Sequence, residues 1–106
     1  MPKYLITGSY SAEGMRGVLK DGGSGRMEAV EHLLKGIGGS MESFYFAFGD
    51  DDVYVVVEAP DNVTTAAVSM AVGASGAVGI KTTVLLTPDE IDRAAKKTVD
   101  YRPPGK

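Results

Sequence analysis

Three consecutive aspartates, Asp50–Asp52, form the densest group of side chains in the sequence that could bind a metal or move a proton. They lie between the aromatic run FYFAFG and the valine run VYVVVE, where a short connection between two strands is expected. Aspartate favours turns because its carboxylate accepts hydrogen bonds from the nearby backbone. A calcium loop alternates its acids and ends in a distal glutamate, and that pattern is missing here. We interpret the cluster as a hairpin turn, with surface metal binding and a catalytic carboxylate as the alternatives.

Two other residues are candidates for acid–base chemistry. Glu58 ends a valine-rich strand, where burial would raise its pKa and suit it to proton transfer. The alternative is a strand-end carboxylate that pairs with Lys81 or stays in solvent. His32, the only histidine, shares a predicted helix face with charged residues, which favours a solvated position over a general base. One histidine and no cysteine predict no metal site.

A second group of residues could bind a ligand. Arg26 follows the glycine-rich segment DGGSG, whose backbone N–H groups could hold an anion at a helix N-terminus. The spacing fits neither a P-loop nor a dinucleotide fingerprint, so a flexible linker or lid is favoured. Tyr10, Tyr45 and Tyr54 could line a pocket between sheet and helices, although strand aromatics more often form core or cross-strand pairs. These four residues are the candidate ligand-binding set, and no cofactor is predicted.

Composition excludes several classes of protein. The chain has 106 residues, which is the size of one domain, and its net charge is −3 with eleven scattered basic residues. An acidic chain without a basic patch is not expected to bind nucleic acid. No apolar run approaches the ~20 residues that span a bilayer, and no signal peptide is evident, so we expect a cytoplasmic protein with no membrane partner.

The first half of the chain contains a strand and a helix. Residues 3–10 are rich in β-branched and aromatic residues and predict a strand. The glycine-rich residues 11–25 predict a helical turn followed by a mobile loop. A clean helical period then starts at Arg26, with Ser24 as N-cap and Gly38-Gly39 as the end. Its apolar stripe consists of Met27, Val30, Leu33, Leu34 and Ile37.

The second half continues with strands at 40–49 and 53–59, a helix from Asp61 to Gly76, a strand at 79–87 and a helix at 88–97. Asp61 is the expected N-cap of the first of these helices. The apolar face of that helix is expected to consist of Val63, Ala66, Ala67, Met70 and Ala74. The order β-α-β-β-α-β predicts a ferredoxin-like α+β fold, with a four-stranded antiparallel sheet, both long helices on one face and a short C-terminal helix. We assign residues 1–97 to this single domain and 98–106 to an extended C-terminal tail.

The strands are apolar on both faces, whereas helices of the same chain can cover only one. The uncovered face would expose an apolar patch larger than monomers usually carry. We therefore expect a homodimer that packs sheet against sheet through this surface, called here the open face. Its main apolar residues are Tyr45, Tyr54, Val56 and Leu85.

The segment FYFAFGDDDVYVVVEAPD, together with SAEG after the first strand, Arg26 and GIGG, resembles the GYD-domain family of small bacterial proteins. The resemblance covers roughly residues 4–90 and implies membership of the dimeric α+β barrel superfamily. The tyrosine of the family's Gly-x-Tyr-Asp hairpin is replaced by Asp51. Matching positions are Gly49, Asp52, Glu58, Ala59, Pro60 and Asp61.

Three hypotheses for function follow. The first is a homodimeric α+β barrel that binds a small apolar or aromatic molecule in a cavity between sheet and helices. The second comes from the resemblance, because superfamily relatives include cofactor-independent monooxygenases; Glu58, His32 and Tyr45 would then be the catalytic candidates. The third is a non-catalytic structural or regulatory module whose interior is filled by its own side chains.

Overall fold

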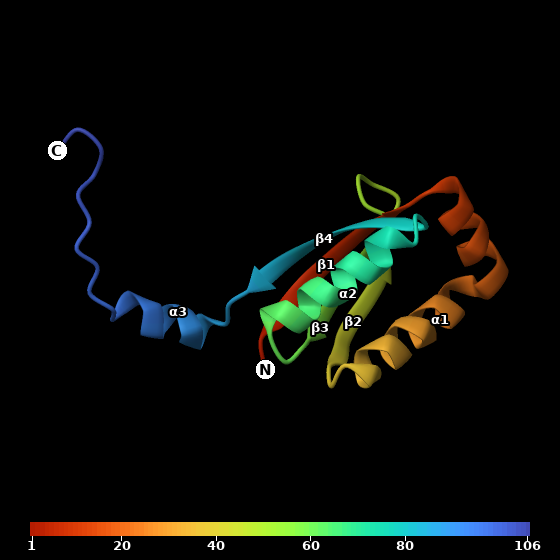
Figure 1. The fold of residues 1–106 in the computed structure, drawn as a ribbon, viewed down its shortest axis with the longest axis horizontal. Helices are drawn as coiled ribbons and strands as arrows, with labels where there is room; N and C mark the ends of the chain where they lie inside the picture. The colour runs from red at the N-terminus through yellow and green to blue at the C-terminus, as the bar shows by residue number, and fades with distance from the viewer.

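The computed structural model describes all 106 residues of the chain. Figure 1 shows a twisted sheet with two long helices against it and a C-terminal segment that extends away. The elements are β1 (Lys3–Tyr10), α1 (Ala12–Gly36), β2 (Ser40–Phe46), β3 (Val53–Glu58), α2 (Asn62–Ala74), β4 (Val78–Leu85) and α3 (Pro88–Ala95).

The four strands form one antiparallel sheet in the order β2-β3-β1-β4. The central strand β1 pairs with both β3 and β4, so that Ile6 lies opposite Val55 on one side and Thr82 on the other. A bulge between Met41 and Ser43 interrupts the pairing of β2 with β3. This topology confirms the predicted ferredoxin-like α+β fold with its short C-terminal helix.

The core lies between the helices and one face of the sheet. Its buried centre is Tyr4 of β1 together with alternate valines of β3 and Leu34 of α1. The predicted apolar stripe of α1 packs here, since Val30, Leu33 and Ile37 are partly buried against the same cluster. The hydroxyl of Tyr4 donates a 2.6 Å hydrogen bond to Oδ1 of Asn62, which ties the sheet to the start of α2.

Helix α1 begins much earlier than predicted. Ser11 is its N-cap and accepts a hydrogen bond from the N–H of Gly14, so the expected mobile loop is helical and Ser24 caps nothing. The backbone of Ser11 also donates to the carbonyl of Ala77 at 2.9 Å. This anchorage at both the cap and β4 offsets the helix-weakening effect of the glycines. Gly22, with φ 77°, is not helical, and the kink at this residue divides α1 into two helical segments.

Asp61 caps α2 as predicted, and its carboxylate accepts a hydrogen bond from the N–H of Thr64. The predicted packing face of α2 is wrong, because Val63 and Met70 are 81% and 74% exposed. The face that meets the sheet includes Thr65 and Ser69, whose hydroxyls bond to helix carbonyls and can therefore be buried at low cost. The face as a whole consists of Thr65, Val68, Ser69 and Val72.

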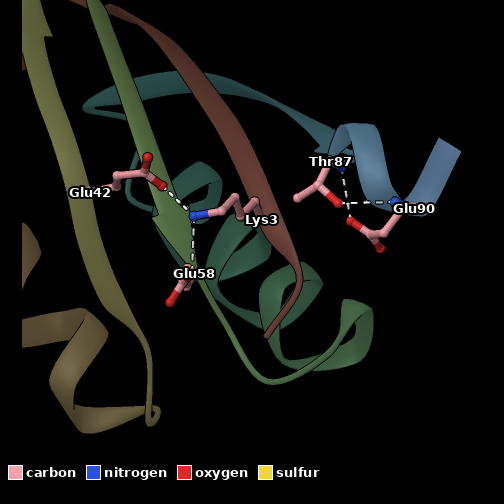
Figure 2. A network of polar contacts seen from close by, with 5 residues as sticks. All are labelled: Lys3, Glu42, Glu58, Thr87 and Glu90. Carbon is pink, nitrogen blue, oxygen red and sulfur yellow. Dashed lines mark hydrogen bonds and ion pairs between the residues drawn. The ribbon is translucent and has the colours of Figure 1, made fainter. Parts of the chain in front are cut away.

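The C-terminal segment leaves the body of the protein after β4 (Figure 1). Helix α3 starts with a complete capping box, in which Thr87 and Glu90 bond reciprocally to each other's backbone N–H groups (Figure 2). No residue of α3 is buried. The molecule measures 56 × 33 × 23 Å, and this segment lies along its long axis.

Candidate functional site

An apolar cavity lies between the two long helices and the middle of the sheet. Helix α1 packs against β2 and helix α2 against β4, which are the two edge strands. The space between the helices and the sheet is partly open to solvent and has a volume of about 310 Å³; we call it the inner cavity. The sheet contributes Ile6, Tyr10, Phe44, Val53, Val55, Val78 and Ile80 to its wall, and the helices contribute Arg26, Ala29, Val30, Leu33, Val68 and Val72.

A second cavity of about 380 Å³, the outer cavity, lies beside the first. It is bounded by the first half of α1, the C-terminal end of α2 and the start of β4. Both volumes fall in the range of about 300–1,000 Å³ that is typical of small-molecule sites. The wall that the two cavities share consists of Tyr10, Arg26, Leu33, Val72 and Val78.

A close backbone contact positions the outer cavity. A Cβ atom added to Gly14 would lie 1.9 Å from the carbonyl oxygen of Ala77, so only glycine lets α1 approach β4 this closely. The same carbonyl accepts hydrogen bonds from the backbone N–H and the hydroxyl of Ser11. The start of α1 is thereby held over the end of β1, next to Tyr10.

Arg26 carries the only charge in the wall of the inner cavity. Its side chain is 33% exposed, and its single ion pair joins Nη1 to Oδ2 of Asp21 across 3.9 Å. That distance is too long for a hydrogen bond. The favoured interpretation of the glycine-rich segment before Arg26 as a linker or lid is wrong, because this segment is helical on both sides of a kink at Gly22. The alternative, an anion site at the start of the helical segment that contains Arg26, stays a prediction.

The aspartates lie in the segment that connects β2 to β3, as the turn interpretation predicts. They also attach this segment to β1 through hydrogen bonds. The carboxylate of Asp52 accepts a 2.8 Å hydrogen bond from the N–H of Tyr10. Asp51 is 8% exposed and contacts both the hydroxyl of Ser9 and the ammonium group of Lys81. No group of three or more acidic or histidine side chains in the protein is arranged to hold a metal ion.

Glu58 belongs to a polar network on the open face (Figure 2). Nζ of Lys3 lies 2.6 Å from Glu42 and 3.0 Å from Glu58, so Glu58 pairs with Lys3 and not with Lys81. The hydrogen bond from Lys3 lowers the pKa of Glu58, whereas burial would have raised it. Hydrogen bonds to the two carboxylates raise the pKa of Lys3, and the bond to Glu42 has the larger effect. Glu58 is therefore held as a carboxylate in an ion-pair network.

The structure separates the residues that the sequence grouped together. Tyr10 and Arg26 line both cavities, but Tyr45 and Tyr54 pair with each other across β2 and β3 on the open face, and neither lines the pocket between sheet and helices. His32 is exposed on α1, in a surface depression formed with other charged side chains of that helix. His32 thus lies on α1, apart from Glu58 and Tyr45 on the open face, and none of the three lines either cavity.

The sequence model of the GYD domain family matches residues 4–95, which includes every residue in the walls of both cavities. The chain belongs to the GYD domain family. No curated protein and no solved structure matches the sequence. None of the helices of this GYD protein has the length and apolar character needed to cross a bilayer.

Sequence reasoning missed the contribution of α2 to the GYD protein's cavities. Val68 and Val72 contribute to the inner cavity, but they lie on the face of α2 that was expected to be exposed. A signal was present, because residues 65, 68, 69 and 72 recur at helical spacing. Asp21, the partner of Arg26, was placed in a loop because glycines surround it.

Proposed function

We propose that this GYD protein is a homodimer, formed through the open face, whose inner cavity binds a small and mostly apolar molecule. The inner cavity is the observation that supports the ligand-binding part of this proposal. Twelve of the thirteen residues in its wall are hydrophobic, and its volume of about 310 Å³ suits a small ligand. An interior filled by its own side chains would leave no such space, because protein cores pack to crystal-like density.

The dimer is supported by the surface area of the single chain. A monomer of 11.1 kDa is expected to expose about 5,700 Å². This chain exposes 7421 Å², and only 10 of its 106 residues are buried. The radius of gyration is 16.9 Å, against about 13 Å for a compact domain of this length. The C-terminal segment, which extends away from the body, accounts for part of this surplus. A second copy on the open face would remove a further part from water.

The open face is a suitable contact surface. Tyr45 and Tyr54 are 70% and 38% exposed and lie side by side on neighbouring strands. Val56 and Leu85 are partly exposed in the same layer. Aromatic residues surrounded by aliphatic ones are typical of the centre of a protein interface. A twofold contact would place this layer against its own copy.

The dimer is tested by sedimentation at micromolar concentration. Val56→Glu should dissociate or unfold the dimer, because it would bury two unpaired carboxylates near each other. Val63→Glu is the matched control: Val63 is 81% exposed on α2, away from the open face, and its replacement should leave the dimer intact. A wild-type protein that stays a folded monomer at every concentration would contradict the proposed dimer.

Ligand binding is tested by native mass spectrometry of the freshly purified protein and by titration with small naphthalene and octyl compounds, both neutral and charged. Methyl NMR signals of Val55 and Val68, in the inner cavity, should shift. Signals of Val56, on the open face, should stay in place. If no compound of either shape shifts the cavity signals at millimolar concentration, the proposal of a ligand cavity is wrong.

A further inference from the structure

The boundary between the two cavities holds hydrogen-bond donors that the protein itself does not use. Arginine presents five N–H donors in a planar fork. Arg26 reaches only the carboxylate of Asp21, at 3.9 Å, and that carboxylate is itself 47% exposed. Tyr10 also lines both cavities. Its backbone N–H bonds to Asp52, whereas no hydrogen bond pairs its phenolic hydroxyl with another group of the chain.

We propose that the ligand is an amphipathic carboxylate: an apolar body in the inner cavity, and one carboxylate group bound by Arg26 at the boundary with the outer cavity. This inference rests on the proposed ligand-binding function and adds the chemical class of the ligand. A guanidinium and a carboxylate match in geometry, because two parallel N–H groups can bond the two oxygens. Tyr10 lines the same shared wall, and its phenolic hydroxyl is a further donor that such a head group could use.

The distribution of charge favours an anion over a cation. Arg26 is the sole charged residue of the inner cavity, whereas the acidic residues Glu13 and Asp21 line only the outer one. An amine drawn to these acids would keep its apolar body outside the inner cavity. A carboxylate can displace Asp21 at little cost, since a long and half-exposed ion pair contributes little to stability.

The test uses two matched sets of probes: 2-naphthoate, 2-naphthalenemethanol and 2-naphthylmethylamine, and octanoate, 1-octanol and octylamine. Affinities are measured by calorimetry at neutral pH. In at least one set the carboxylate should bind roughly 10- to 100-fold more tightly than the alcohol, which is the usual gain from hydrogen bonds to a charged group. The amine should bind more weakly than the alcohol, because it would face Arg26.

Arg26→Gln should remove the preference for the carboxylate while the alcohol still binds, which also shows that the variant is folded. Arg16→Gln is the matched control, because Arg16 is exposed on the same helix and lines neither cavity. If Arg26→Gln does not fold, Asp21→Asn serves instead: it removes the competing carboxylate and should strengthen binding of the acid by severalfold.

Two results would overturn the inference alone: an alcohol or amine that binds as tightly as the acid in both sets, or an unchanged preference in Arg26→Gln. In both cases the cavity still takes an apolar body, so the proposed function survives. Failure of all six probes to bind contradicts both the inference and the proposed function.

Discussion

Two glycines of α1, only three positions apart, should respond in opposite directions to the same substitution. Gly14 lies against the carbonyl oxygen of Ala77, where an added Cβ would lie at 1.9 Å. Gly17 has no atom within 4 Å of the corresponding position. Both have ordinary helical backbone geometry, because the positive φ of α1 occurs only at Gly22. Replacement by alanine therefore separates helix propensity from tertiary contact.

The magnitudes follow from the contacts. At Gly17, alanine should raise the free energy of unfolding by about 0.5–1 kcal/mol, because a glycine in a helix loses more conformational entropy on folding. At Gly14, the helix must move about 1 Å from Ala77 to reach an allowed contact. That movement breaks both hydrogen bonds from Ser11 to the carbonyl, at a cost of about 1–3 kcal/mol. After the gain in helix propensity is subtracted, the net loss for Gly14→Ala is about 1 kcal/mol.

The assay is urea unfolding followed by circular dichroism, at one fixed protein concentration because association shifts the midpoint. Gly17→Ala should unfold at a higher urea concentration than the wild type and Gly14→Ala at a lower one. Equal stabilisation by both substitutions would show that α1 does not approach β4 closely, and the described wall of the outer cavity would then be wrong.

Two further predictions concern the core and the charged groups. Leu34→Ala, at a side chain 2% exposed, should cost about 2–5 kcal/mol of unfolding free energy, whereas Leu19→Ala, at 79% exposed, should change it by less than about 0.5 kcal/mol. If thermal melts showed a similar loss of stability for Leu34→Ala and Leu19→Ala, Leu34 would lie outside the core. Hydrogen bonds lower the pKa of Glu58, Asp61 and Glu90, so their contribution is present at neutral pH and is lost as pH falls through their folded values. The melting temperature should therefore decrease below about pH 5, and a constant value down to pH 3 would contradict these contacts.

Much of the fold could be predicted because local signals and packing agree. The alternation of β3 places Val53, Val55 and Val57 in the core, and the cap at Asp61 fixes the start of α2. The predictions that were wrong concern segments where tertiary contacts override local preference. The glycines of α1 disfavour a helix, but the carbonyl of Ala77 stabilises one.

The candidate site could be predicted only in part. Tyr10 and Arg26 were identified from their residue types, and the structure places both in the wall that the cavities share. The position of Val72 relative to Tyr10 and Arg26 depends on which face of α2 is turned toward the sheet. Small residues occur on both sides of α2, so the sequence does not determine that orientation. In the structure the hydroxyl of Ser69 contacts that of Thr82 on β4, which links α2 to the sheet in this orientation. The hydroxyls of Thr65 and Ser69 also bond to carbonyls of α2 and its cap, so this polar face can be buried.

In the proposed dimer, the network of Lys3, Glu42 and Glu58 would restrict how the two sheets meet. It contains two acids and one base, so its side chains carry one excess negative charge at the same end of the open face in each copy. The charged N-terminus, which acts on Glu58, offsets this excess only in part. A symmetry axis through this end would oppose like charges, whereas an axis near Tyr45 and Tyr54 would leave the networks at the periphery, in contact with water. The apolar surface alone would allow several relative orientations of the two copies. The charges of this network would favour one of them.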